Sequence, residues 1–227
     1  SYTYGDTKNV YIKGAEDIRF GIDIRGGVDV TFMPADGVEA TDDQMTAAKT
    51  VIEDRLVGLG ITDYEDYVDY NKDRIIVRFP WKTGETDFNP QTAIDEIGTT
   101  AEMVFRKGST ADGEEILSGD DVTSATAGYN QENGYVVQLQ YSADGAKKFA
   151  EATTELAAQS NGTISIWLDG ENISTATVKT AITDGNAVIE GSFTQDQVTA
   201  LANQINSGSL PFALSAESFS TISPTLG

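Results

Sequence analysis

The sequence predicts an α+β protein made of two modules, the second inserted into the first. Apolar residues recur at every second position in some stretches, which is typical of half-buried strands, and at steps of three and four in others, which is typical of amphipathic helices. A small, polar stretch at residues 107–113 shows neither pattern and separates two such sets. With 227 residues, the chain is long enough for two domains of ordinary size.

The first predicted element is a strand around residues 20–32 with an interruption at Arg25-Gly26-Gly27. Paired glycines permit positive φ or a bulge, so the strand is expected to bend or break there. Asp23 and Arg25 lie two positions apart and should share one face, where chemistry alone predicts an exposed ion pair of small energetic value. The alternating apolar residues on either side are Phe20, Ile22, Ile24, Val28, Val30 and Phe32.

The next elements complete a β-α-β-β-α-β order. A capping box at Thr41 begins the first helix, and Asn89-Pro90 begins a second one that ends at Gly98. This order is typical of the split β-α-β, or ferredoxin-like, arrangement, an antiparallel sheet with two helices on one face. The remaining strands of this set are predicted at residues 64–70, at residues 74–79, which Pro80 closes, and at residues 101–106.

A second α+β set follows the polar stretch. Asp169-Gly170 predicts a tight hairpin turn, and apolar residues after Pro211 predict a closing strand that returns to the first module. The expected strands are residues 134–141, 164–168 and 187–190, and the expected helices begin at Ser142 and at the Thr194–Gln197 capping box and end at Asn161-Gly162 and Gly208.

These elements divide the chain into a base of residues 1–107 and 211–227 and an inserted head of residues 108–210. The chain then crosses between the modules twice, near Lys107 and Gly108 and again near Gly208 and Pro211. Two neighbouring crossings that contain glycine would form a hinge. A rigid interface between base and head is the alternative that the sequence leaves open.

The composition excludes several classes of function. There are 36 acidic and 15 basic residues, a formal charge of −21, and such a surface repels nucleic-acid phosphates and anionic lipids. Because the chain has no cysteine and no histidine, disulfides, thiol catalysis, Ser-His-Asp triads and ordinary zinc sites are excluded. Phosphate-binding loops are absent, and no two carboxylates stand out as a catalytic pair. We therefore expect no enzyme, no cofactor, no metal and no nucleic-acid partner.

Four Asp-Gly pairs raise the question of calcium binding. None of them has the alternating-ligand loop of an EF-hand, so turns are predicted instead. The pairs begin at Asp112, Asp144, Asp169 and Asp184.

No stretch approaches the roughly 20 apolar residues of a transmembrane helix. The chain is therefore expected to be either a soluble protein or a loop taken from between two membrane segments. The first residues already resemble the middle of a strand, which favours the second interpretation.

The string Phe20-Gly-Ile-Asp-Ile-Arg-Gly-Gly27 resembles the Asp-x-Arg-Gly-Gly signature that follows the first transmembrane helix of SecD and fused SecDF proteins, accessory subunits of the bacterial Sec translocase. The sequence departs from the family pattern at Thr175-Ala176, which puts the exit of a hairpin in doubt, and at Ser223. Further similar strings occur in the same order to the end of the chain, at residues 54–60, 73–80, 98–106, 143–153, 166–174, 189–194, 207–211 and 224–227.

The resemblance implies an extracytoplasmic domain of a cell-membrane protein, with a membrane-proximal base and a mobile head. The motif residues Asp23, Arg25, Gly26 and Gly27 would lie near the membrane. The domain would bind unfolded preprotein weakly and reversibly and change its head-to-base orientation, which assists translocation driven by the proton motive force. Its partners would be the preprotein, the Sec channel and SecF, or the SecF half of a fused chain. The proton pathway would lie in membrane helices outside this chain.

Apolar residues of the head are the candidates for preprotein contact. Those on the predicted helices should line the interior and border any groove, whereas Trp167 either covers a sheet face or is available to a partner. Two other functions remain open: a docking ectodomain that holds translocase subunits without touching substrate, and a hydrolase. The candidate contact residues are Phe149, Leu156, Trp167, Val198 and Ile205.

Overall fold

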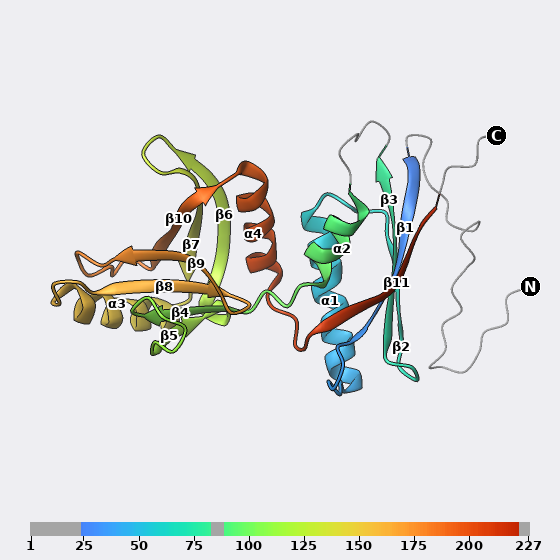
Figure 1. Ribbon diagram of the computed structural model, residues 1–227, viewed down its shortest axis with the longest axis horizontal. Helices are drawn as coiled ribbons and strands as arrows, with labels where there is room; N and C mark the ends of the chain where they lie inside the picture. Colours follow the sequence, from blue (N-terminus) through green and yellow to red (C-terminus); the bar gives the residue numbers. More distant parts are fainter. Residues whose placement is uncertain (1–23, 83–88, 223–227) are drawn as a thin grey trace, which may run out of the picture. The chain divides into compact units, whose positions relative to one another are not determined.

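A computed structural model describes residues 24–82 and 89–222 of the chain (Figure 1). The chain divides into two compact units, each with its own core. The first unit is Ser1–Thr100 together with Leu210–Gly227, and the second is Ala101–Ser209. In the described part of the chain, none of the helices combines the length and the hydropathy of a transmembrane segment.

The first unit is one antiparallel sheet with two helices on the same face (Figure 1). The strand order is β11-β1-β3-β2, and every neighbouring pair is antiparallel. The strands are β1 (Ile24–Pro34), β2 (Glu65–Asp69), β3 (Arg74–Lys82) and β11 (Leu214–Ile222), and the helices are α1 (Asp42–Gly58) and α2 (Pro90–Gly98).

Local sequence signals account for both helices of this unit. The Thr41 hydroxyl accepts a hydrogen bond from the Gln44 N–H in a complete capping box, and the Asn89 side chain caps α2 with Pro90 at its start, as predicted. A Cβ at Gly98 would lie 2.7 Å from the Phe32 ring, so glycine lets the end of α2 approach the sheet. The apolar stripes of α1 and α2 are buried at Met45, Ala48, Ile52, Leu56, Ala93, Ile94 and Ile97.

The predicted break in the first strand is confirmed in part. The register of β1 against β3 shifts between Ile24 and Gly26, which is the irregularity that the paired glycines predict, and Gly26 and Gly27 are both buried. Asp23 and the side chain of Arg25 lie outside the described residues. The expected ion pair between them therefore stays a prediction.

Two boundaries in the first unit differ from the prediction. Strand β3 continues through Pro80 to Lys82, because β2 pairs with β3 only as far as Arg78 and proline is tolerated where a strand has a partner on one side. The strand predicted at residues 101–106 does not belong to this unit. The fourth strand is β11, which pairs with β1 as expected of a closing strand at the end of the chain.

The second unit contains two antiparallel sheets and two helices. One sheet has the order β5-β4-β8-β9 and the other β10-β7-β6. The elements are β4 (Met103–Lys107), β5 (Glu115–Ser118), a 3₁₀ turn η2 (Gly119–Asp121), β6 (Val122–Asn130), β7 (Gly134–Tyr141), α3 (Ala143–Ala157), β8 (Thr163–Leu168), β9 (Glu171–Thr177), β10 (Asn186–Phe193) and α4 (Gln195–Ser207).

A continuous apolar core explains why β4 belongs to this unit. The side chains of Met103 and Phe105 are buried in the same cluster as α3, α4 and both sheets. The rings of Phe105 and Tyr141 meet edge to face at 5.8 Å, and the ring of Phe149 lies 4.9 Å from that of Tyr141. Burial of these large rings holds β4 in the second unit, so the boundary between the units lies before β4 and not at the polar stretch after Lys107.

Candidate functional site

The structure places the two crossings at the peptide bonds Thr100–Ala101 and Ser209–Leu210. The predicted hinge residues Gly208 and Pro211 flank the second crossing, and Gly208 ends α4 with a φ of 82°. In the first unit, the Leu210 N–H donates a hydrogen bond of 2.9 Å to the Thr100 carbonyl. The backbones of the two crossings therefore lie side by side.

The first crossing is earlier in the chain than the sequence predicted. The Lys107 N–H donates to the Glu114 carbonyl at 2.9 Å, and the Gly108 N–H donates to the Thr163 carbonyl at 2.8 Å. All four residues belong to the second unit. The polar stretch at residues 107–113 is thus the turn between β4 and β5, and the prediction that Lys107 and Gly108 lie at the crossing is wrong.

Side chains fix the backbone on both sides of the Thr100–Ala101 peptide. In the first unit, the buried Arg55 guanidinium donates to the Ile97 carbonyl at 3.1 Å and to the Thr99 carbonyl. In the second unit, the Asp169 carboxylate accepts hydrogen bonds from the N–H groups of Ala101, at 3.0 Å, and of the next residue, at 2.8 Å. Ala101 has a φ of 54°, a left-handed conformation that is uncommon for alanine.

Asp169 thus has a second role beside its predicted turn. Asp169 and Gly170 have φ values of 50° and 81°, as in a type I′ hairpin turn, which confirms the predicted hairpin between β8 and β9. The contact with Ala101 was missed because it joins residues far apart in the sequence, and no local pattern indicates it.

Most residues predicted for preprotein contact are inaccessible. The exposed fractions of the Phe149, Leu156 and Val198 side chains are 5%, 4% and 1%, and all three lie in the core of the second unit. These residues were predicted from the apolar stripes of α3 and α4, and the same stripes pack against the sheets of the second unit. A polypeptide outside the folded unit cannot reach these residues.

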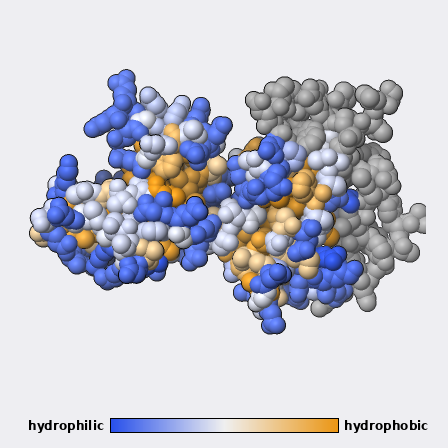
Figure 2. Space-filling view, in the orientation of Figure 1, coloured by the Kyte–Doolittle hydropathy of each residue, from blue (hydrophilic) through white to orange (hydrophobic). Residues whose placement is uncertain are grey.

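The other two predicted residues are closer to the surface. Ile205 is half-buried and packs against the core. The Trp167 ring is also half-buried, and its indole N–H donates to the Ser165 hydroxyl at 2.8 Å, so it covers the sheet with its polar atom satisfied. In the second unit, Figure 2 shows apolar surface in the region of β6, β10 and α4.

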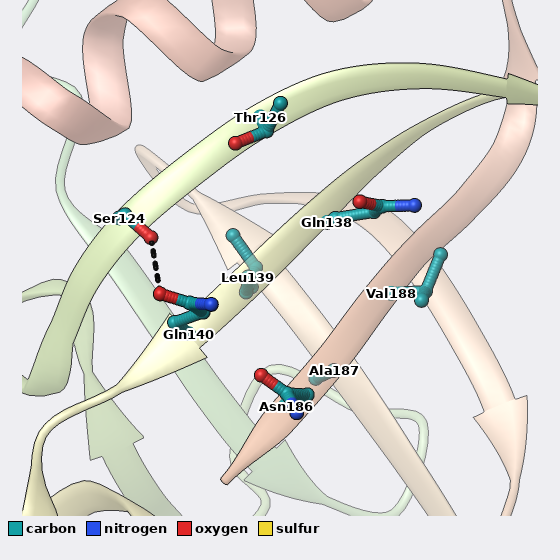
Figure 3. Close-up of a pocket in the computed structure, with 8 residues that line it drawn as sticks. All are labelled: Ser124, Thr126, Gln138, Leu139, Gln140, Asn186, Ala187 and Val188. Carbon is teal, nitrogen blue, oxygen red and sulfur yellow. Dashed lines mark hydrogen bonds between the residues drawn. The ribbon is translucent and has the colours of Figure 1, made fainter.

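The outer face of the sheet β10-β7-β6 carries a shallow polar hollow of about 370 Å³ (Figure 3). The Ser124 hydroxyl donates to the Gln140 side-chain oxygen at 3.1 Å. The side chains of Gln138 and Thr126 make no hydrogen bond with any of the described residues. The lining is uncharged, so it suits a neutral ligand with hydrogen-bonding groups. It is formed by Ser124, Thr126, Gln138, Leu139, Gln140, Asn186, Ala187 and Val188.

The first unit contains a cluster of one lysine and two carboxylates between α1 and β2. The Lys49 ammonium lies 2.7 Å from the Glu53 carboxylate and 3.6 Å from Oδ2 of Asp66. Burial raises the pKa of the Asp66 carboxyl to about 6, and the neighbouring Glu53 adds to the shift. Burial also raises the pKa of the Glu53 carboxyl, but hydrogen bonds with Asp66 and Lys49 outweigh this effect and lower the pKa below its ordinary value. The two carboxyls can share one proton.

Nothing in the described part of the chain resembles a metal centre. No group of three or more histidine, cysteine, aspartate or glutamate residues in this part is placed to hold a metal ion.

Comparison with known proteins identifies close sequence relatives. The family model "SecDF, P1 head subdomain" matches residues 98–212. The protein translocase subunits SecD of Dictyoglomus turgidum and Acidaminococcus fermentans are 36% and 35% identical over 92% and 96% of this chain, and the matched regions are 50% of each relative. The chain thus spans about half the length of these curated relatives.

Solved structures give the same result. A crystal structure of SecDF in a super-membrane-facing form matches 92% of this chain, and 32% of its own chain, with a TM-score of 0.73 and 28% identity. A structure of SecDF described as a membrane component that enhances protein export matches 84% of this chain and 98% of its own, with a TM-score of 0.69 and 26% identity. The sequence relative SecDF of Thermus thermophilus is 29% identical over 92% of this chain and 32% of its own.

Proposed function

The chain belongs to the SecD/SecDF family of protein translocase subunits, and we propose that it is an extracytoplasmic domain that binds unfolded preprotein weakly and reversibly. The residues matched by the head-subdomain model nearly coincide with the second unit, which supports its assignment as the head, and the first unit would then be the membrane-proximal base. Reorientation of head against base would then assist the movement of preprotein driven by the proton motive force.

The observation that carries this proposal is the arrangement of the two crossings. Each unit buries an apolar cluster of its own, and the chain passes between the units at two peptides that lie side by side. Two units that have separate cores and are linked by two backbone segments can move against each other as rigid bodies, because a few backbone dihedrals can absorb the movement. The arrangement supports a hinge at Thr100–Ala101 and Ser209–Leu210.

The topology of the first unit supports a ferredoxin-like base. Its strands and helices follow the order β-α-β-β-α-β once β11 is counted as the last strand, and the sheet order places the first and third strands in the middle. Such a base gives a stable support with both ends of the inserted head leaving from it. The fold class alone implies no activity.

Weak binding fits the energetics of the task. An unfolded segment that covers roughly 300 Å² of apolar surface gains about 7 kcal/mol gross at about 25 cal/mol per Å². The loss of chain and association entropy offsets most of that gain. What remains is reversible binding without strong sequence preference, which lets a polypeptide be captured and released.

The proposal assigns no proton-carrying or catalytic residue to this chain. Moving one charge through a potential of 100 mV yields about 2.3 kcal/mol only when the charge moves within the membrane field. The energy would therefore be supplied by other parts of the translocase. The partners would be the preprotein, the Sec channel and SecF or a SecF half of the same chain, on the extracytoplasmic side of the cell membrane.

A docking role is the second candidate. Strand β11 lies at the edge of the first sheet, and the Phe219 side chain on it is 46% exposed. An edge strand with an exposed aromatic ring is a surface on which a partner subunit could pair. In this alternative, the domain holds subunits together and never contacts preprotein.

Photocrosslinking in the full-length membrane protein separates the two functions. A benzophenone amino acid is placed at Val188 or Tyr129, which are 45% and 64% exposed on the second unit, or at Phe219 on the first, and a secretory precursor is stalled in the channel. Adducts between the precursor and either the Val188 or the Tyr129 position support preprotein binding. Adducts only between the Phe219 position and translocase subunits support docking and contradict preprotein binding.

A further inference from the structure

Three aromatic side chains form a row across the sheet β10-β7-β6. Tyr129 of β6 is the direct register partner of Tyr135 of β7, and Tyr135 is in turn the partner of Phe193 of β10. The rings of Tyr129 and Tyr135 meet edge to face with centroids 5.0 Å apart. Direct partners point to the same face of a sheet, so the three rings share the face that carries the buried residues Val137 and Ile189.

The row lies where this core face reaches the surface. Tyr135 and Phe193 are half-buried and pack against the core, whereas Tyr129 is 64% exposed. The turn that follows β6 extends at the upper edge of the second unit in Figure 1. A Cβ at Gly191 would lie 2.9 Å from the Phe193 ring, so the glycine allows this ring to lie over the backbone at the bulge in β10. The backbone of β10 therefore determines the position of the Phe193 ring.

Two carboxylates lie at the same end of the sheet as the aromatic row. Glu132 is exposed in the turn between β6 and β7. The Glu190 carboxylate of β10 accepts a hydrogen bond of 2.9 Å from the Asn133 side chain, which lies in the same turn. Two lysines of this unit pair with other carboxylates, Lys107 with Glu155 and Lys148 with Asp121. The end of the sheet therefore combines aromatic faces with negative charge.

We propose that Tyr129, Tyr135 and Phe193 form a platform for an extended polypeptide segment that carries apolar side chains together with lysine or arginine. This inference rests on the proposed preprotein binding and names its site and the chemistry of the bound segment. Aromatic rings offer large rigid contact area, and their faces attract cations. The carboxylates of Glu132 and Glu190 would favour the same cations over acidic segments.

The neutral hollow on the other face of this sheet is the competing location. Val188 contributes to that hollow, and its register partner Gln138 lies on the face opposite Val137. Because the two faces are lined by different residues, substitutions can be confined to one of them. Val188 therefore provides a matched control for Tyr129, as both are large, exposed residues of the same sheet.

The test is a binding titration with the 227-residue chain and two labelled synthetic peptides. One peptide alternates leucine with arginine, and the other has glutamate at each arginine position. Fluorescence anisotropy should show binding of the arginine peptide and little binding of the glutamate peptide. Tyr129→Ala should weaken binding of the arginine peptide on the order of tenfold, whereas Val188→Ala should leave it unchanged.

A second pair of variants tests the carboxylates. The double variant Glu132→Gln and Glu190→Gln should weaken arginine-peptide binding severalfold and reduce its dependence on salt. A control double variant at Glu115 and Glu171, two exposed carboxylates of the other sheet, should not. Equal binding of both peptides would contradict the charge preference.

Each remaining outcome decides the proposal. Unchanged affinity in Tyr129→Ala, or loss of affinity in Val188→Ala instead, would overturn the aromatic row while preprotein binding in the crosslinking experiment stands. No binding of the arginine peptide would overturn it as well, and the precursor crosslinks from Val188 and Tyr129 then decide the proposed function separately. Binding to phosphatidylcholine vesicles that Tyr129→Ala abolishes would assign the row to a membrane surface and also overturn the proposal.

Discussion

Single residues in the first unit carry two features that can be measured directly. Arg55 is buried and donates hydrogen bonds to the backbone before the first crossing. The pKa of the Asp66 carboxyl is raised by burial. Oδ2 of Asp66 is buried and has no hydrogen-bond partner in the described structure. Such an atom is satisfied when the carboxyl shares a proton with Glu53.

The Asp66 carboxyl should make the stability of the first unit depend on pH. An acid whose pKa rises on folding, here from 3.8 to about 6, binds its proton more tightly in the folded chain. Its ionisation therefore destabilises the folded state above about pH 6, and this penalty is lost as the pH falls from about 6 to about 4. Asp66→Asn should raise the urea midpoint at about pH 7 and remove this part of the pH dependence.

An exposed carboxylate provides the control for this measurement. Asp63→Asn, in the loop before β2, should leave the pH profile of the urea midpoint unchanged. The lowered pKa of Glu53 works in the opposite sense, since its stabilisation is lost at lower pH, below its ordinary value of 4.5. An Asp66→Asn profile parallel to that of the unmodified chain would contradict the assignment.

Arg55→Ala should destabilise the first unit by about 3 kcal/mol, because it leaves buried carbonyl groups of α2 and the crossing without their donor. Arg55→Lys keeps the charge but presents a different donor geometry, so an intermediate loss is expected. Urea unfolding followed by the amide signals of the first unit measures both. A loss below about 1 kcal/mol in the alanine variant would show that the carbonyls find other donors.

At the scale of elements, a side chain from α4 forms hydrogen bonds with the free edge of strand β6. The Asn206 amide of α4 accepts a hydrogen bond from the Ala125 N–H and donates one to the Ala125 carbonyl, both at 2.8 Å. These are the two bonds that a neighbouring strand would make, so Asn206 occupies the free edge as a substitute for backbone pairing. The contact also ties α4 to the sheet that carries the aromatic row.

Asn206→Ala should therefore expose the edge of β6. The exchange rate of the Ala125 amide hydrogen should increase on the order of tenfold, as expected for the loss of roughly 1.4 kcal/mol of local protection. Gln204→Ala, on the same helix, serves as the control. An unchanged exchange rate at Ala125 in the Asn206 variant would show that the strand edge is protected by packing alone.

Elements with strong local signals could be predicted from the sequence. The capping boxes at Thr41 and Thr194 and the turn at Asp169-Gly170 are formed by neighbouring residues, so their patterns are complete within a few positions. Strands β5 and β6 were not predicted. Strand β6 has small and polar residues at most positions, and its pairing with β7 rather than its own pattern makes it a strand.

At the scale of the whole molecule, the insertion of one module into another could be predicted, but the crossing points could not. The sequence favoured Gly108 because glycine is the usual sign of a flexible joint, whereas the first crossing contains threonine and alanine. The contacts that define it join distant residues, as Asp169 does with Ala101. The aromatic row was also hidden, because a bulge in β10 determines which residue lies beside Tyr135.

The distance between the two units is the sharpest measure of whether the head turns against its base. The chain has no cysteine, so Val57→Cys in the first unit and Val188→Cys in the second, both at exposed positions, can carry a specific pair of spin labels. Pulsed electron–electron double resonance then gives the distance distribution with and without the arginine peptide. A head that turns against its base should give a broad or multiple distribution that shifts when the peptide binds. A single narrow distribution, identical in both samples, would contradict a head that turns against its base.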